Sequence, residues 1–225
     1  MYRNPIVIER ALTKNGEIQL QKRGSDYEII FNGTFLMATY NGESERSLVN
    51  AALRAVKNPQ SVLIGGLGVG FSLEEALRYE QIEKITVVEI EKKIIDWNHT
   101  YLAEFSHHGL LDPRVEVVHA DFIEWLPGCQ ELYDVICLDI DNGPDWLVME
   151  KNHQLYSDTG VHNLLRILDR SGAISFWSAS RSDVFEQQLS KWFDQIYIHP
   201  VPHPRGEPDY IYVAVDPRLS RDRGA

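Results

Sequence analysis

Hydrophobic and polar positions alternate through much of the first forty residues. This period of two predicts β-strands at Glu17–Lys22, Asp26–Phe31 and Thr34–Thr39. The Asn32-Gly33 pair between the last two strands is a strong hairpin signal. We therefore expect residues 1–43 to form a small antiparallel β-meander.

A helical period follows the predicted meander. Ser44 is a suitable N-cap, and the apolar residues of the next turns share one face of a helix. These residues are Leu48, Val49, Ala52, Leu53 and Val56. The helix would lead the chain into a larger domain.

From Ser61 onwards, short apolar strands alternate with helices. The first four strands are rich in valine and isoleucine, as expected of strands buried on both faces. The expected strands are 61–64, 85–89, 115–119, 135–139, 173–177, 195–200 and 210–215. The expected helices are 72–79, 92–105, 122–126, 160–169 and 183–193. This order predicts a parallel, doubly wound α/β sheet, which binds ligands at the carboxyl ends of its strands. We assign residues 44–217 to this Rossmann-like domain and residues 218–225 to a frayed tail.

Composition narrows the possible functions. No apolar stretch approaches the roughly 18–20 residues that span a bilayer, and the N-terminus lacks the apolar segment of a secretory signal. We therefore expect a cytoplasmic protein with no membrane partner. A formal net charge of −11 argues against nucleic-acid binding. The two cysteines, Cys129 and Cys137, and the spacing of the histidines do not indicate a metal site.

The segment Ser61–Phe71, Ser-Val-Leu-Ile-Gly-Gly-Leu-Gly-Val-Gly-Phe, is the most informative part of the sequence. A dinucleotide-binding turn requires a glycine where Phe71 stands, and a P-loop requires a lysine that this segment lacks. The G-x-G-x-G spacing is instead typical of turns that hold S-adenosylmethionine. The alternative is an ordinary strand-to-helix turn with incidental glycines. The candidate cofactor-binding glycines are Gly65, Gly66, Gly68 and Gly70.

Acidic residues follow the next two strands. Glu89 ends the second strand, where a carboxylate can accept hydrogen bonds from both ribose hydroxyls of a nucleoside. Asp121 follows the third strand and could accept from the exocyclic amine of adenine, while Phe122 or Ile90 packs on the adenine ring. The alternatives are that Glu89 is a solvated glutamate and that Asp121 caps the short helix 122–126.

The strand Tyr133–Asp139 delivers a further carboxylate to the same edge. Asp139 is our candidate catalytic residue, because a pair of close carboxylates can bind an ammonium group and accept its proton. Asp141 and Asn142 follow in a turn and are candidate substrate-binding residues. Aromatic candidates for the wall of a substrate pocket are Trp146, Tyr156 and Trp177.

These residues together resemble the spermidine synthase-like branch of the class I S-adenosylmethionine-dependent methyltransferase superfamily. The resemblance runs from about Ile30 to Val215. It implies a seven-stranded sheet with helices on both faces and an antiparallel last strand. It also implies that Glu89 binds the ribose, Asp121 binds the adenine and Asp139 acts on the attacking amine. A homodimer formed through the N-terminal meander is a further implication.

The sequence departs from this family's pattern at the positions expected to bind the donor and at those expected to bind the acceptor. Aminopropyltransferases of the family usually carry Gly-Gly-Gly-Asp-Gly-Gly, whose aspartate holds the aminopropyl amine of decarboxylated S-adenosylmethionine, and here that position is Gly68. The usual Asp-Ser-Ser/Thr-Asp-Pro is replaced by Asp139-Ile-Asp-Asn-Gly143. The residues in place of the family's Gln and Tyr-His-Glu signature are Leu36, Glu45, Arg46 and Ser47.

Three hypotheses follow. The leading hypothesis is methyl transfer from intact S-adenosylmethionine to a small-molecule nucleophile, for which a cationic amine is a candidate. Its basis is Gly68, which would leave backbone N–H groups available to the carboxylate of the intact cofactor. The alternative is aminopropyl transfer from decarboxylated S-adenosylmethionine to an amine acceptor. The third hypothesis is a noncatalytic nucleoside-binding or scaffold protein that retains the fold.

Overall fold

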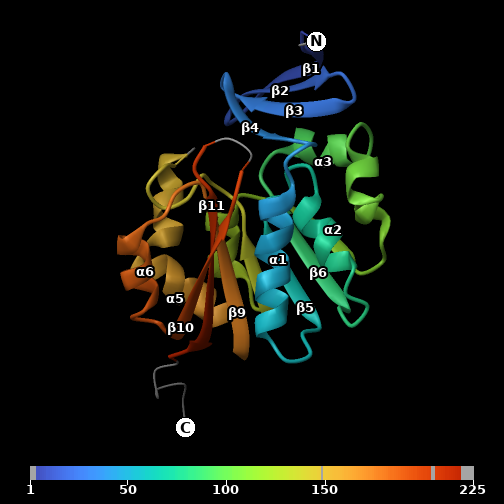
Figure 1. Cartoon of the computed structure of the whole chain (residues 1–225). Helices are drawn as coiled ribbons and strands as arrows, with labels where there is room; N and C mark the ends of the chain where they lie inside the picture. Colours follow the sequence, from blue (N-terminus) through green and yellow to red (C-terminus); the bar gives the residue numbers. More distant parts are fainter. Residues whose placement is uncertain (1–3, 148, 204–205, 219–225) are drawn as a thin grey trace.

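The N-terminal meander is an antiparallel sheet at one end of the molecule (Figure 1). The computed structural model describes residues 4–147, 149–203 and 206–218. In this part of the chain the meander contains β1 (Ile6–Thr13), β2 (Gly16–Arg23), β3 (Asp26–Phe31) and β4 (Thr34–Ala38), hydrogen-bonded in that order.

β1 is the strand of the meander that the sequence pattern did not define. Its register with β2 shifts between Val7 and Glu9, so the alternation of faces is interrupted there. Three consecutive apolar residues, Ile6–Ile8, precede and overlap this irregularity. The period of two is therefore hidden at the beginning of the chain.

The larger sheet has seven strands within the described ranges, in the order β10–β11–β9–β8–β5–β6–β7. β5 to β9 run parallel, whereas β11 is antiparallel to both of its neighbours, β9 and β10. This arrangement confirms the predicted doubly wound sheet with an antiparallel last strand. The bounds are β5 (Ser61–Gly65), β6 (Lys84–Glu89), β7 (Val115–His119), β8 (Tyr133–Leu138), β9 (Leu168–Ser178), β10 (Phe193–Val201) and β11 (Asp209–Pro217).

Helices cover both faces of this sheet (Figure 1). One face carries α1 (Glu43–Ala55), α2 (Phe71–Leu77) and α3 (Lys92–Asn98). The other carries α4 (Phe122–Trp125), α5 (Asp158–Ile167) and α6 (Asp183–Leu189). Alternate residues of one strand supply the two cores: Val62 and Ile64 pack with the first set of helices, and Leu63 packs with the second.

Several helix predictions differ from the structure, and the expected helices 160–169 and 183–193 end early, at Ile167 and Leu189. α1 begins at Glu43 with Gly42 as its N-cap, so Ser44 lies inside the helix and is not the cap. The expected helix 92–105 ends at Asn98, because the Leu102 N–H bonds the Trp97 carbonyl at 2.8 Å and the helical pattern stops. Short 3-10 helices occur at η1 (Ala103–Ser106), η2 (Gly109–Leu111), η3 (Leu126–Gly128) and η4 (Glu150–Tyr156).

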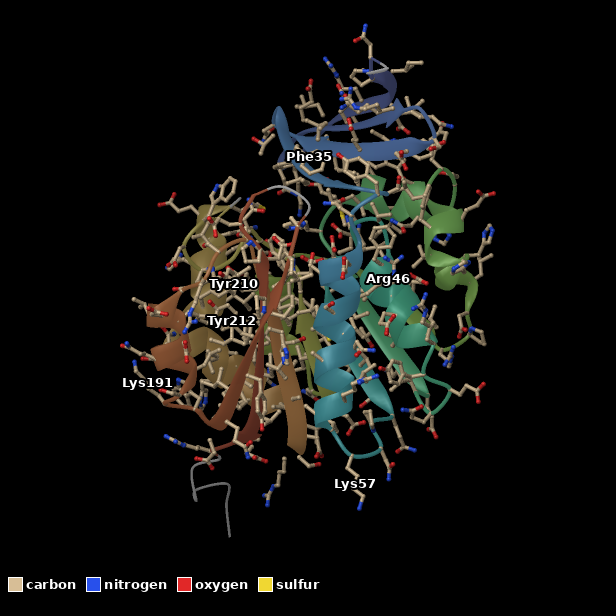
Figure 2. All side chains as sticks on the ribbon, viewed as in Figure 1. Phe35, Arg46, Lys57, Lys191, Tyr210 and Tyr212 are labelled. Carbon is tan, nitrogen blue, oxygen red and sulfur yellow. The ribbon has the colours of Figure 1, made fainter. Side chains whose placement is uncertain are left out.

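The meander lies against the carboxyl edge of the parallel strands (Figure 1). The turn between β1 and β2 reaches Glu91, whose Oε1 accepts from Asn15 Nδ2 at 2.6 Å and from Thr13 Oγ1 at 3.2 Å. Because β11 is antiparallel, its first residues lie at this same edge, and Figure 2 shows Tyr210 nearer the meander than Tyr212. Residues from distant parts of the sequence therefore meet there.

No helix in the described ranges is long and apolar enough to cross a membrane. Of the predicted frayed tail, residues 219–225 lie outside the described residues.

Candidate functional site

A cavity of about 170 Å³ lies between the meander and the carboxyl edge of the larger sheet. Its wall combines residues of β3, β4 and α1 with the segments that follow β5, β6, β7 and β8. The structure therefore brings most of the predicted site residues together. Those that line the cavity are Gly66, Gly68, Glu89, Ile90, Asp121, Phe122, Asp139, Asp141 and Asn142.

Most of the other predicted site residues do not line the cavity. Gly65 is the last residue of β5, and Gly70 is the N-cap of α2. Tyr156 is buried in the core, where its ring packs edge-on against Phe185 at 5.3 Å between centroids. Of the two tryptophans considered as walls, Trp177 lines the cavity, whereas Trp146 is 59% exposed on the surface.

The turn after β5 needs glycine at Gly66 for steric reasons. Gly66 has a φ of +90°, and a Cβ there would lie 2.1 Å from the Asp139 carbonyl oxygen. Its N–H donates to the Val88 carbonyl at 2.9 Å, and the Gly70 N–H donates to the Leu67 carbonyl at 2.8 Å. The turn is thus held tightly between the ends of β6 and β8.

The remaining N–H groups of the turn also have partners within the protein. Leu67 N donates to Glu89 Oε2 at 2.8 Å, and a backbone hydrogen bond from Gly68 also lowers the pKa of Glu89. Val69 N lies 3.2 Å from Met37 Sδ, which accepts from it. The N–H groups of Gly66, Leu67 and Gly70 are therefore engaged by oxygen acceptors of the protein, and that of Val69 by a weak thioether acceptor. The expectation that Gly68 leaves an N–H group for a cofactor carboxylate stays a prediction.

Glu89 links the glycine turn to the beginning of α3. Its Oε1 accepts from Glu91 N at 2.8 Å, and its Oε2 accepts from Leu67 N. Burial raises the pKa of Glu89, and the hydrogen bonds from backbone N–H groups lower it in part. The carboxylate lines the cavity with lone pairs to spare, so a role in ribose binding stays a prediction.

Asp121 and Asp141 both have hydrogen-bond donors within reach. Asp121 caps α4 by accepting from Ile123 N at 3.0 Å, and it also forms an ion pair with Lys151. Asp141 accepts from Asn152 Nδ2 at 2.6 Å and from Asn142 N at 2.9 Å. The capping role proposed for Asp121 is therefore present in the structure, and its adenine role stays a prediction.

Asp139 differs from these acids. In the described part of the chain, no hydrogen-bond donor reaches its carboxylate. Burial raises the pKa of Asp139 well above its ordinary value, and the negative charges of Glu45, Asp209 and Glu89 raise it further. An acid in such an environment can accept and release a proton near neutral pH.

Two further groups face the same cavity without strong partners. Glu45, from α1, is buried and accepts from Ser44 Oγ at 3.0 Å. Burial raises the pKa of Glu45 to about 7, and the charge of Asp209 contributes to the shift. The indole N–H of Trp177 is buried and has no acceptor among the described residues.

Glu45 and Met37 were not predicted as site residues. Glu45 stands three, four and seven residues before Leu48, Val49 and Ala52, so it is an acid on the apolar face of α1. An acidic residue on the apolar face of a helix is the feature of the sequence that could have indicated a functional carboxylate at Glu45. Met37 lies in an ordinary strand pattern, and only the docking of the meander brings it to Gly68.

The order of the seven strands, the antiparallel β11 and the cavity beside the glycine turn define a class I methyltransferase-like domain. Residues 43–194 match the family described as Spermine/spermidine synthase domain. The chain belongs to this family.

Individual relatives agree with this assignment. The chain is 26% identical over 199 residues to the polyamine aminopropyltransferase of Thermococcus onnurineus, covering 84% of this chain and 68% of that one. It is 33% identical over 130 residues to the polyamine aminopropyltransferase of Saccharolobus solfataricus, covering 58% of this chain and 42% of that one. This chain therefore spans less than half the length of the Saccharolobus relative.

The fold is also that of a solved spermidine synthase in complex with the transition-state analogue AdoDATO. The TM-score is 0.78 at 21% identity, with 93% of this chain and 73% of that chain covered. The spermidine synthase of Thermotoga maritima gives a TM-score of 0.75 at 21% identity, with 93% and 72% covered.

These comparisons correct the leading functional hypothesis. The predicted resemblance to spermidine synthases is confirmed by the family match. The prediction of methyl transfer from the intact cofactor is wrong, because the matching family is that of spermine and spermidine synthases and the relatives are aminopropyltransferases.

Proposed function

We propose that this protein transfers an aminopropyl group from decarboxylated S-adenosylmethionine to an amine acceptor. The observation that carries the proposal is the charge of the cavity wall. Its described lining residues include six carboxylates and neither lysine nor arginine. These carboxylates belong to Glu45, Glu89, Glu91, Asp121, Asp139 and Asp141. Such a wall favours cationic ligands, and both reactants of this transfer are cations.

The wall also fits the adenosyl part of the donor. Glu89 would accept from the ribose hydroxyls, and Asp121 would accept from the adenine amine. Ile90 and Phe122, which also line the cavity, supply apolar surface for the base. The donor supplies a carbon attached to a positively charged sulfur, and that carbon is the site of attack.

The same wall disfavours intact S-adenosylmethionine. Intact cofactor carries an additional carboxylate, which would lie among acids of the same charge. The N–H groups of Gly66, Leu67 and Gly70 do not compensate, because each already bonds an oxygen of the protein. Loss of that carboxylate removes both difficulties, and this supports the decarboxylated donor.

Asp139 would act on the acceptor. A protonated amine cannot attack, because its lone pair is occupied by the proton. The carboxylate of Asp139 has no donor within the described structure, so it is available to bind the ammonium group and take one proton. Glu45 stands near enough to raise the pKa of Asp139 and thereby makes it a stronger base.

A product assay tests this proposal. The purified chain is incubated with decarboxylated S-adenosylmethionine and a series of α,ω-diamines and longer polyamines, and methylthioadenosine and the extended amine are measured by mass spectrometry. We expect both products in equal amounts, and loss of both in Asp139→Asn. Asp145→Asn, which changes an exposed acid of the loop after β8, is the matched control and should stay active. Absence of both products with every amine, from a protein that binds the donor, would contradict the proposal.

A further inference from the structure

The six acids that line the cavity differ in how far the protein itself supplies their hydrogen-bond donors. Four of them accept from donors on other residues of the chain: Glu89, Glu91, Asp121 and Asp141. Within the described ranges, Asp139 has no donor, and Glu45 accepts only from Ser44 Oγ at 3.0 Å and from its own backbone N–H. Glu45 and Asp139 therefore line the cavity with lone pairs that the protein leaves unused.

Arg46, the next residue of α1, does not neutralise Glu45. Its Nε lies 2.6 Å from Glu74 Oε2 on α2, the helix toward which Figure 2 shows it. Its guanidinium carbon also lies 4.2 Å from the centroid of the Phe71 ring. Glu45 itself is only 7% exposed, so water solvates its carboxylate poorly. A buried carboxylate in this position favours a ligand that brings a positive charge.

The backbone places Glu45 beside the glycine turn. The carbonyl of Glu45 accepts from Ser72 Oγ at 3.4 Å, which joins the first turn of α1 to the first turn of α2. Asp139 borders the other end of the glycine turn, because its carbonyl oxygen lies where a Cβ on Gly66 would be. The two acids therefore flank the turn from α1 and from the end of β8.

The order of the strands sets the order in which the parts of the donor would bind. Asp121 follows β7 and would bind the adenine, and Glu89 ends β6 and would bind the ribose. β5 is the next strand of the sheet, and β8 comes after it. The part of the donor that extends from the ribose through sulfur would therefore lie over the glycine turn, between Glu45 and Asp139.

Aminopropyl transfer, the proposed function on which this inference rests, brings two ammonium groups to this end of the cavity. One is the terminal ammonium of the donor's aminopropyl chain, and the other is the acceptor amine. The glycine turn cannot supply a carboxylate, because a Cβ on Gly68 would lie 2.2 Å from Met37 Sδ. Since Asp139 would take the proton of the acceptor, Glu45 is the acid that remains for the donor.

We propose that Glu45 binds the terminal ammonium of the donor's aminopropyl chain. This contact holds the far end of the chain and presents the carbon next to sulfur to the acceptor at Asp139. The acceptor gives one proton to Asp139, and its nitrogen forms a bond to that carbon. The carbon–sulfur bond breaks, and its electron pair goes to sulfur. Glu45 keeps its contact with the ammonium throughout and gains no proton from the reaction.

Two thioethers of adenosine separate the ammonium from the rest of the donor. Methylthioadenosine has a methyl group on its neutral sulfur, whereas 5′-deoxy-5′-(3-aminopropylthio)adenosine has the aminopropyl chain there. Neither contains a sulfonium, so neither transfers a group during a calorimetric titration. We expect the wild type to bind the aminopropyl thioether at least about 10-fold more tightly than methylthioadenosine. Glu45→Gln should lose this preference and should bind methylthioadenosine as the wild type does.

Glu43→Gln is the matched control, because Glu43 is an exposed acid in the same turn of α1. It should keep the preference for the aminopropyl thioether. An unchanged preference in Glu45→Gln would overturn the proposal, and a higher KM for the acceptor in that variant would then assign Glu45 to the acceptor. An equal loss of affinity for both thioethers would also overturn it, because the effect would not depend on the ammonium.

These titrations contain no acceptor and involve no reaction, so they separate this inference from the proposed function. A wild type that prefers the aminopropyl thioether through Glu45, but forms no product with any amine, would count against aminopropyl transfer alone. A wild type that forms product, but shows no preference that depends on Glu45, would overturn the role of Glu45 alone.

Discussion

The carboxylate of Glu89 accepts the backbone N–H of Leu67 at 2.8 Å, so the end of β6 holds the glycine turn that follows β5. The other oxygen of Glu89 accepts from Glu91 N, also at 2.8 Å. The residue predicted to bind ribose thus also shapes the turn beside it. Binding and local stability should change together when it is replaced.

Glu89→Ala should lower both donor affinity and stability. The change leaves buried N–H groups of Leu67 and Glu91 without their acceptor, which costs about 2–4 kcal/mol of unfolding free energy. Donor affinity should fall at least about 10-fold, because the ribose also loses a partner. Urea unfolding and calorimetric titration measure the two effects. Glu83→Ala, at an exposed position before β6, is the control, and an equal response in both variants would refute the assignment.

Met37 occupies the space that a side chain at Gly68 would need. A Cβ on Gly68 would lie 2.2 Å from Met37 Sδ, at a backbone φ of +51°. The turn therefore cannot take the aspartate that related aminopropyltransferases usually have there unless Met37 moves. The negative charge near the donor must come from other elements, such as α1 and β8.

Gly68→Asp alone should destabilise the protein by about 1–3 kcal/mol, through the contact with Met37. The double variant Met37→Ala/Gly68→Asp should cost less than the sum of its two single changes, because the alanine makes room for the aspartate. Urea unfolding of the four proteins of this cycle measures the coupling. Additive effects would show that Met37 does not limit the turn.

Asp139→Asn should remove turnover without weakening the fold. We expect kcat to fall by about 10²–10⁴ and donor affinity to change little, because the amide cannot take the proton of the acceptor. The unfolding free energy should not fall, since a buried charge beside Glu45 and Asp209 is removed. Steady-state kinetics with donor titration tests this, and a fully active variant would refute the role.

Glu45 should make the protein less stable as pH rises. Its pKa in the folded chain is raised from 4.5 to about 7, so folding favours its protonated form. The contribution of Glu45 to the free energy of unfolding is fully present below its pKa in the unfolded chain. This contribution is lost as pH rises through about 7, the pKa of Glu45 in the folded chain. Acids with a lowered pKa, such as Glu28, lose their contribution only at lower pH.

From about pH 5.5 to about pH 8, the unfolding free energy of the wild type should therefore fall by on the order of 2 kcal/mol more than that of Glu45→Gln. Urea unfolding at the two pH values measures the difference. Glu83→Gln, which changes an exposed acid, should behave like the wild type. Parallel pH profiles for wild type and Glu45→Gln would show that Glu45 is not held in its protonated form.

The convergence of Glu89, Asp121 and Asp139 could be predicted from the sequence because parallel strands end at one edge of a sheet. No such rule places Met37 or Glu45, since their positions depend on how the meander and α1 dock. The β10–β11 connection is a similar case: the antiparallel last strand was expected, but the pairing of His203 with Asp209 is a tertiary contact.

The error about methyl transfer, which rested on Gly68, has a different physical origin. A glycine turn before a helix ordinarily offers free N–H groups, and the sequence pattern cannot show where they point. In the structure, Glu89 accepts from Leu67 N and Met37 Sδ accepts from Val69 N. Tyr156 was misplaced for a related reason, because its ring turns into the core beside Phe185.

The most direct test of the donor's identity compares two ligands that differ by one carboxylate. Calorimetric titration of the wild-type protein with decarboxylated and with intact S-adenosylmethionine gives both affinities under the same conditions. A cavity lined by six acidic side chains predicts at least about 10-fold tighter binding of the decarboxylated form. Equal or tighter binding of intact S-adenosylmethionine would contradict the proposed aminopropyl transfer.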